Sequence, residues 1–187
     1  MESSTIKSEL YLAIFGLFGS GKTTLARGLL QSDGGAINIR DNKDIKYCVS
    51  SGKKYTFAGH YLENSKFGGG DTIYCRNLYK ILQKSPTPIF ISEGCRVQSF
   101  GPQFLRAFFS TKTQGIVYLR GAPSLCCERV LKRGGGSASS NYDKLTLVEN
   151  LVKKFIDLGT NVLVLDINNS KDYILQQTLN FIDELQK

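Results

Sequence analysis

The chain has 187 residues, 41% of them hydrophobic, which suits one domain with a substantial buried core. No apolar stretch approaches the roughly 20 residues that cross a bilayer, and residues 1–9 lack both an apolar signal core and an Arg-rich amphipathic pattern, so we expect a cytoplasmic protein with no membrane partner. The net charge of +8 favours a polyanionic partner, although a basic surface that is merely solvated would carry the same charge.

A phosphate-binding motif follows the first predicted strand. Residues 10–15 form a continuous apolar run typical of a buried parallel strand, and a helix is predicted over residues 23–31. Between them, Gly16-Leu17-Phe18-Gly19-Ser20-Gly21-Lys22-Thr23 matches the Walker A pattern G-x-x-x-x-G-K-[ST] at every fixed position. The glycines let the backbone fold around an anion, so that successive N–H groups and the helix N-terminus point at a phosphate.

This loop predicts a nucleotide donor, with ATP and Mg²⁺ as the expected cofactors. Lys22 is expected to reach the β- and γ-phosphates, and the Thr23 hydroxyl to bind Mg²⁺. The residues predicted to contact the donor are Gly16, Phe18, Gly19, Ser20, Gly21, Lys22, Thr23 and Thr24.

The next segment interrupts the alternation of strands and helices. Residues 46–50 and 55–61 predict a hairpin with a Gly-containing turn, within a small acceptor-side insertion over residues of about 40–70. Its lysines and tyrosines would follow the backbone of a nucleic acid acceptor. Asp71 then precedes a helix predicted over residues 72–84, where it caps the helix, contacts the acceptor, or does both.

Two later strands end in polar residues. Residues 89–92 are followed directly by Glu93, and residues 116–119 by Arg120. Because the carboxyl ends of parallel strands meet at the edge that carries the phosphate loop, Glu93 is expected beside that loop. Two roles stay open for it: a base that takes the proton of an acceptor hydroxyl, and a carboxylate that holds a Mg²⁺-bound water.

The remaining elements complete an α/β pattern. Arg129 and Arg133 are four residues apart at the end of a helix predicted over residues 123–132, so both can point into the cleft. The Gly- and Ser-rich stretch that follows predicts a flexible lid over about residues 133–145. A helix at 145–158, a strand at 162–165 and a helix at 172–185 come next. The elements together predict a single domain with the three-layer P-loop NTPase fold: a parallel five-stranded sheet flanked by helices, with a small hairpin insertion and a lid.

The chain resembles the nucleoside monophosphate kinase superfamily, most closely its thymidylate-kinase-like branch. Three segments carry this resemblance: the phosphate loop at residues 16–23, the segment 89–96, and residues 129–133 with the Gly/Ser stretch after them. A finer resemblance is to small phage P-loop kinases, which act on deoxynucleotides or on 5-hydroxymethyluracil in DNA. It is carried by Gly59-His60-Tyr61, by residues 66–72, and by residues 91–94 followed by Ser99-Phe100-Gly101. The resemblance implies that Arg96 clamps a phosphate and, for a viral chain, that the compartment is the host cytoplasm.

Three functions therefore stay open. The first is ATP- and Mg²⁺-dependent phosphorylation of the hydroxymethyl group of 5-hydroxymethyluracil in DNA. The second is phosphorylation of free deoxynucleoside monophosphates, and the third is noncatalytic nucleic acid binding. Tyr61 and Phe67 either stack on a pyrimidine or pack in the core, and the protein is a monomer or a homodimer. The predicted catalytic residues are Lys22, Glu93, Arg96, Arg129 and Arg133, and the predicted acceptor-binding residues are Tyr61, Phe67, Asp71 and Arg96.

Overall fold

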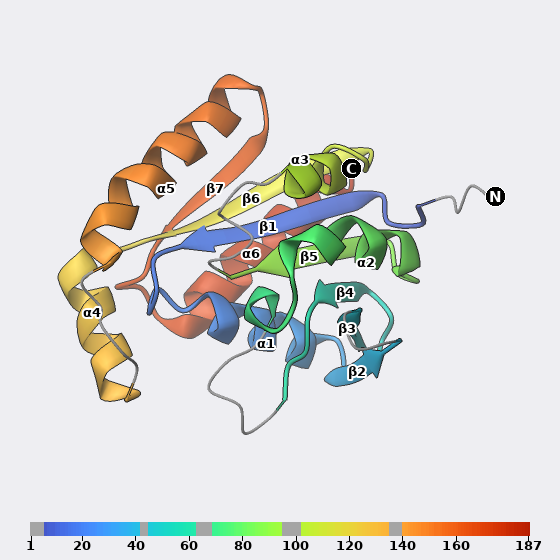
Figure 1. The fold of residues 1–187 in the computed structure, drawn as a ribbon, viewed down its shortest axis with the longest axis horizontal. Helices are drawn as coiled ribbons and strands as arrows, with labels where there is room; N and C mark the ends of the chain where they lie inside the picture. The colour runs from blue at the N-terminus through green and yellow to red at the C-terminus, as the bar shows by residue number, and fades with distance from the viewer. Residues whose placement is uncertain (1–5, 42–44, 63–68, 95–101, 135–139) are drawn as a thin grey trace.

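A computed structural model of the chain describes residues 6–41, 45–62, 69–94, 102–134 and 140–187. Its strands form one sheet in the order β2-β3-β4-β5-β1-β6-β7 (Figure 1). The strands are β1 (Leu10–Gly16), β2 (Ala36–Arg40), β3 (Lys46–Ser50), β4 (Tyr55–Ala58), β5 (Ile89–Glu93), β6 (Thr113–Arg120) and β7 (Asn161–Asp166). Every residue of β1 is buried, as its unbroken apolar sequence requires for a strand in the middle of the sheet.

The sheet is mostly parallel. Strands β4, β5, β1, β6 and β7 run in one direction, with Leu10 of β1 paired to Ile89 of β5 and to Thr113 of β6. Strand β3 runs antiparallel to both of its neighbours, β2 and β4, and the β2–β3 pair extends the sheet beyond β4. The predicted α/β class is confirmed, but the predicted five strands are corrected to seven within the described residues. The reason is that β3 and β4 belong to the main sheet, and that β2, largely exposed, carries little hydrophobic signal.

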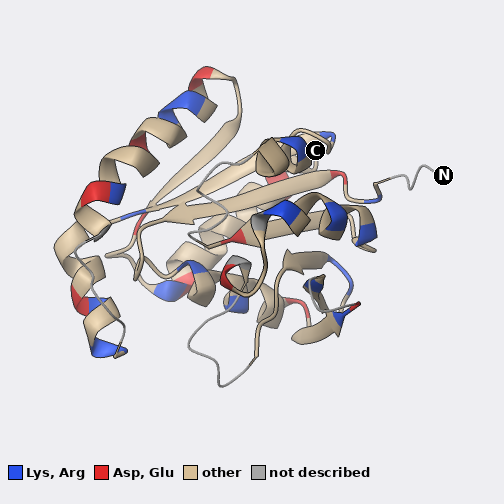
Figure 2. Cartoon of the chain, in the orientation of Figure 1, with Lys and Arg blue, Asp and Glu red and all other residues tan. Residues whose placement is uncertain are grey.

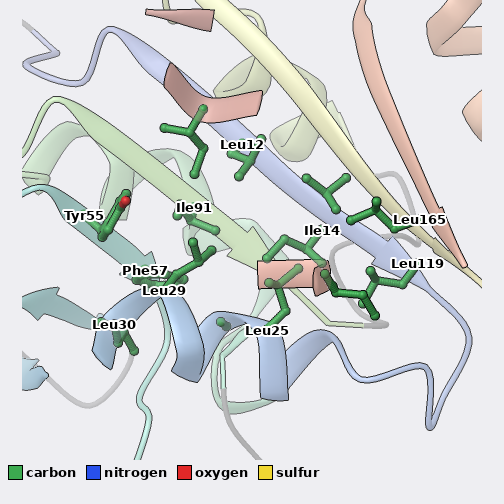
Figure 3. Packing of buried hydrophobic residues seen from close by; sticks show 14 of the residues in the cluster. Leu12, Ile14, Leu25, Leu29, Leu30, Tyr55, Phe57, Ile91, Leu119 and Leu165 are labelled. Atoms are coloured by element: carbon green, nitrogen blue, oxygen red, sulfur yellow. The ribbon is translucent and has the colours of Figure 1, made fainter. Parts of the chain in front are cut away.

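Helices cover both faces of the sheet. Leu12 and Ile14 of β1 pack in one core with Leu29 of α1 (Lys22–Ser32) and Ile182 of α6 (Lys171–Leu185), which Figure 3 shows in part. Tyr11, Ala13 and Phe15 point to the opposite face because side chains alternate along a strand. That face is covered by α2 (Leu78–Lys84), α3 (Pro102–Phe108) and α5 (Ser140–Asp157). The fold is therefore a three-layer α/β/α arrangement, with α4 (Pro123–Lys132) beside the phosphate loop.

Two predicted elements differ from the structure. The helix predicted over residues 72–84 begins only at Leu78, because the preceding residues form 3₁₀ turns, η1 (Gly70–Thr72) and η2 (Cys75–Asn77). The Thr72 hydroxyl accepts from His60 N–H and donates to Gly69 O, which holds this stretch against the loop after β4. Asp71 is therefore not the cap of α2, a position that Asn77 takes.

The predicted lid also differs in its second half. Residues 140–145 are the first turn and a half of α5, so this part of the segment is a helix, whereas residues 135–139 lie outside the described residues. Among the described helices, none is both long and apolar enough to span a membrane.

Candidate active site

The phosphate loop connects β1 to α1 at the C-terminal edge of the parallel strands (Figure 1). Gly19 and Gly21 have φ angles of 82° and 98°, in the region that side chains other than glycine rarely adopt. A Cβ atom at position 19 would lie 2.3 Å from the carbonyl oxygen of Cys126 on α4. The loop backbone is thus packed against α4, and its path requires glycine at this point.

Lys22 is folded over the loop that precedes it. Its side chain is buried, and Nζ donates hydrogen bonds to the carbonyl oxygens of Gly16 at 2.9 Å and Leu17 at 2.8 Å. These carbonyls hold the ammonium group at the mouth of the loop. A polyphosphate bound there would offer the ammonium anionic oxygens, which form stronger charge-assisted hydrogen bonds than a carbonyl does.

The N-terminus of α1 supplies further donors. The first backbone hydrogen bond of the helix runs from Leu25 N–H to Gly21 O, and Gly21 has no side chain to cap the helix. The N–H groups of Lys22, Thr23 and Thr24 therefore precede the first intrahelical bond and point out of the helix end. With the helix dipole, they make this end of α1 suitable for a phosphate.

Glu93 lies beside the loop, at the end of β5. Its Oε1 accepts hydrogen bonds from Thr23 Oγ1 at 3.0 Å and from Tyr61 Oη at 3.2 Å. Its Oε2 is buried and has no hydrogen-bond partner among the described residues. The Thr23 hydroxyl and this carboxylate are oxygen ligands of the kind that Mg²⁺ prefers, so the residues fit the ion.

The surroundings of Glu93 alter its acidity. Burial raises the pKa of the carboxyl group from 4.5 to about 7, since the charged form loses its hydration. The Lys22 charge lowers the pKa, the Asp71 charge raises it, and the hydrogen bonds from Thr23 and Tyr61 lower it. Burial, followed by the Glu93 charge, likewise raises the pKa of Tyr61 well above its usual value, so the phenol stays protonated and acts as a donor. Near neutral pH, Glu93 can therefore both hold and release a proton.

Two of the four predicted acceptor-binding residues, Tyr61 and Asp71, lie in the described part of the chain. The ring of Tyr61 is 3% exposed and packs edge-on against Phe57, so it is not placed to stack on a base, and only its hydroxyl faces the site. This corrects the stacking interpretation, because the ring is part of the core. Asp71 is half-buried in the 3₁₀ turn η1, near enough for its charge to act on Glu93. Phe67 and Arg96 lie outside the described residues.

A cleft of about 540 Å³ opens on the other side of the loop. Arg129, Arg133 and Lys132 of the α4 end line it together with the loop, and Leu175 and Asp172 of α6 form the far wall. Arg129 Nη2 donates to Ile167 O at 3.3 Å, which anchors that guanidinium at the cleft, whereas Arg133 follows the helix as its C-cap and is exposed. The structure thus brings the two arginines to the same cleft as Gly19, Ser20, Gly21 and Thr24.

The fold is similar to that of solved kinases. A sugar kinase from Janibacter sp. HTCC2649 superposes with a TM-score of 0.55 at 16% identity, over 94% of this chain and 95% of that one. Deoxyadenosine kinase from M. mycoides with bound dCTP gives a TM-score of 0.54 at 12% identity, over 93% of this chain and 99% of that one. The chain has the fold of these kinases. The sequence itself matches no protein-family model and shows no significant similarity to a curated protein.

One contact to the phosphate loop is not indicated by the sequence. Asn141, fully buried in the first turn of α5, accepts from Phe18 N–H at 3.1 Å and donates to Phe18 O at 3.0 Å. The Lys144 ammonium lies 3.9 Å from the centroid of the Phe18 ring. Both backbone groups of Phe18, a predicted donor-binding residue, are thus bonded to Asn141 and are not free for a phosphate. Asn141 fixes the loop to the helix that follows the α4 segment.

Replacing Asn141 by alanine is expected to loosen the phosphate loop. The variant leaves the half-buried Phe18 N–H and C=O without their protein partner, which costs about 1 kcal/mol of unfolding free energy. We expect calorimetry to show weaker binding of Mg²⁺-ATP, because the loop must then be ordered by the nucleotide. Tyr142→Ala, an exposed neighbour on the same turn, is the control. Unchanged nucleotide affinity in Asn141→Ala would show that the clamp has no part in binding.

Proposed function

We propose that the protein is a kinase that transfers the γ-phosphoryl group of Mg²⁺-ATP to an alcohol. The observation that carries the proposal is Glu93, a buried carboxyl group with a pKa of about 7 beside the phosphate loop, one of whose oxygens has no hydrogen-bond partner in the described part of the chain. The acceptor oxygen attacks the γ-phosphorus, its proton passes to Glu93, and the bond from the γ-phosphorus to the bridging oxygen breaks to release ADP.

The other charged groups have separate roles in this step. Lys22 and the N-terminus of α1 bind the phosphates, Thr23 holds the Mg²⁺ that neutralises them, and Arg129 and Arg133 approach from the α4 side of the cleft. Mg²⁺ bound at Thr23 would supply positive charge that offsets the charge of the phosphates. The Thr23 hydroxyl, an oxygen ligand at the start of α1, supports this assignment.

The raised pKa of Glu93 favours an alcohol over a phosphate as the acceptor. A phosphate monoester is already anionic at neutral pH and needs no base, whereas an alcohol must lose a proton as it attacks. A carboxylate whose pKa is near the working pH takes that proton efficiently. The acceptor that fits both this chemistry and the net charge of +8 is the hydroxymethyl group of 5-hydroxymethyluracil within DNA.

A free deoxynucleotide acceptor is the second candidate. It is supported by the fold similarity to deoxyadenosine kinase from M. mycoides, whose structure with the products dCMP and dCDP superposes with a TM-score of 0.52 at 13% identity, over 93% of this chain and 98% of that one. A free nucleotide needs no surface outside the cleft, and its phosphorylation should respond little to moderate salt, whereas a DNA acceptor binds more weakly as salt rises.

Transfer of labelled phosphate from ATP decides between these acceptors. The enzyme is incubated with Mg²⁺ and γ-labelled ATP, and with duplex DNA that contains 5-hydroxymethyluracil, the same duplex with thymine, or free deoxynucleoside monophosphates. We expect label in the modified duplex alone. Label in the free nucleotides alone would replace the DNA acceptor by the second candidate, and no label in any acceptor, with intact binding of Mg²⁺-ATP, would overturn both acceptor assignments.

A further inference from the structure

A basic groove lies between α2 and α3, away from the phosphate loop. It has a volume of about 620 Å³ and is lined by Arg76, Asn77, Tyr79, Lys80, Gln83, Gln103 and Arg106. The apolar residues of these helices point into the core, as Leu78, Ile81, Phe104 and Phe108 do, which leaves the polar residues on the outer side. Figure 2 shows basic and no acidic residues on α2 and α3.

Three cations of the groove are available to a ligand. Arg76, Lys80 and Arg106 are exposed, and within the described residues none of them makes an ion pair. Neighbouring basic residues differ in this respect, since Lys84 on α2 pairs with Asp41, and Lys54 pairs with Asp183. No acidic side chain of the described part of the chain lines the groove. Such an arrangement attracts a polyanion.

The remaining groove residues indicate which class of polyanionic ligand the groove would bind. The Arg106 guanidinium lies 4.1 Å from the centroid of the Tyr79 ring, so an aromatic face and a planar cation are paired at the groove wall. Gln83 and Gln103 add amide groups that can bond phosphate or sugar oxygens. Cations interleaved with aromatic rings and amides are the combination that binds a nucleic acid strand, with phosphates on the cations and bases or sugars against the ring.

The groove begins, along the chain, a few residues after the acceptor side of the candidate site. Asp71, whose charge acts on Glu93, lies in η1, and Arg76 lies in the next 3₁₀ turn along the chain, η2. From there α2 carries Lys80 along the groove. This order along the chain favours a strand whose acceptor base lies near Glu93 and whose neighbouring phosphates contact these cations.

The predicted nucleic acid contacts of the hairpin over residues 46–61 suit this role less well. The Tyr55 ring is 1% exposed, and Lys54 forms an ion pair with Asp183. Lys54 and Tyr55 are therefore less available than the exposed cations of the α2/α3 groove, which form no ion pair in the described part of the chain.

We propose that the groove formed by Arg76, Lys80 and Arg106 binds the sugar-phosphate backbone of the DNA strand that carries the acceptor base. This inference rests on the proposed DNA acceptor, and it adds a docking surface that lies outside the catalytic cleft. The groove holds the strand through its phosphates, so binding should depend on salt and little on base sequence.

The test measures binding without catalysis. Fluorescence anisotropy of a labelled single-stranded DNA of mixed sequence is followed over a salt titration, with no ATP present, for the wild type and for the triple variant Arg76→Ala, Lys80→Ala, Arg106→Ala. All three side chains are exposed, and circular dichroism checks the fold. We expect the triple variant to bind about tenfold more weakly or worse. The slope of log K against log salt concentration should become shallower by about 2, the value for three phosphate contacts on a single strand.

Lys84→Ala is the matched control, because it removes a cation of the same helix that is already paired with Asp41. Equal DNA binding by the wild type and the triple variant would overturn the groove. Equal loss of binding to DNA and to a labelled poly-glutamate peptide, at the same salt, would show a general anion surface and overturn the nucleic acid assignment.

Failure of the groove and failure of the proposed function give different results. If modified DNA accepts no phosphate while binding still depends on the three cations, the acceptor proposal fails and the groove stands. If modified DNA is phosphorylated and the triple variant binds it as the wild type does, the groove alone is wrong.

Discussion

Lys22→Ala is expected to lose phosphoryl transfer by about 10³-fold or more, with the fold intact. Lys22 is the buried cation at the mouth of the phosphate loop, and in the proposed reaction it brings the charge that stabilises the transferred group. Removal of one such preorganised group typically costs 10²–10³-fold in rate, and here the same change also weakens binding of the polyphosphate. The measurement is the rate of label transfer from γ-labelled ATP, together with the Mg²⁺-ATP affinity by calorimetry.

The control for Lys22→Ala is Lys112→Ala, which removes an exposed cation from the turn before β6. It should transfer phosphate at the wild-type rate. Thermal unfolding of both variants separates a lost catalytic group from a lost fold, since Lys22 also bonds two loop carbonyls. Phosphoryl transfer that persists in folded Lys22→Ala at a rate near that of the wild type would contradict the assigned role. A wild type that binds DNA but transfers nothing would favour the noncatalytic alternative.

The sequence predicts those parts of the site that depend on local pattern. The Walker A motif indicates a loop between a strand and a helix, and the structure has that loop between β1 and α1. Glu93 is expected beside the loop because it follows a buried strand directly, and its hydrogen bond from Thr23 places it there. Both inferences need only the rule that parallel strands end at one edge of the sheet.

The parts that the sequence does not predict depend on contacts between distant residues. Asn141 binds the backbone of Phe18 across 123 residues of sequence, and nothing near either residue indicates the pair. Tyr61 could stack on a ligand or pack in the core, and the choice is made by Phe57 and Glu93. The α2/α3 groove likewise requires the packing of two helices, because neither α2 nor α3 alone has a run of basic residues.

Glu93→Gln is expected to change the pH dependence of stability in protein free of nucleotide and metal. The pKa of Glu93 is raised from 4.5 to about 7, so between these values the unfolded chain has released the proton while the folded chain retains it. The free energy of unfolding of the wild type therefore falls as pH rises from about 4.5 to 7, by an amount of about 3 kcal/mol, and stays lowered above pH 7. Glutamine carries no such charge, so the variant should gain stability relative to the wild type as pH rises.

The measurement is thermal unfolding in EDTA at pH values on both sides of 7. The melting temperature of the wild type should fall relative to Glu93→Gln by several degrees between pH 5 and 8, since about 1 kcal/mol corresponds to 2–4 °C in a protein of this size. Glu9→Gln, a change at an exposed carboxylate before β1, should follow the wild type. A constant difference between Glu93→Gln and the wild type at all pH values would show that the carboxyl group does not titrate in this range.

The rate of phosphoryl transfer by Glu93→Gln distinguishes a general base from a carboxylate that only positions Thr23. A general base contributes about 10²–10⁴-fold to the rate, so Glu93→Gln should lose transfer by that factor. Glutamine still offers an oxygen to the Thr23 and Tyr61 hydroxyls, so a merely positioning carboxylate should be replaced at little cost in rate. The rate of the wild type under saturating Mg²⁺-ATP should also rise with pH on the acid side as Glu93 ionises, and the residual rate of the variant should lack that rise. A variant that keeps the wild-type rate while showing the stability change would remove Glu93 from the chemistry and leave it as a buried structural acid.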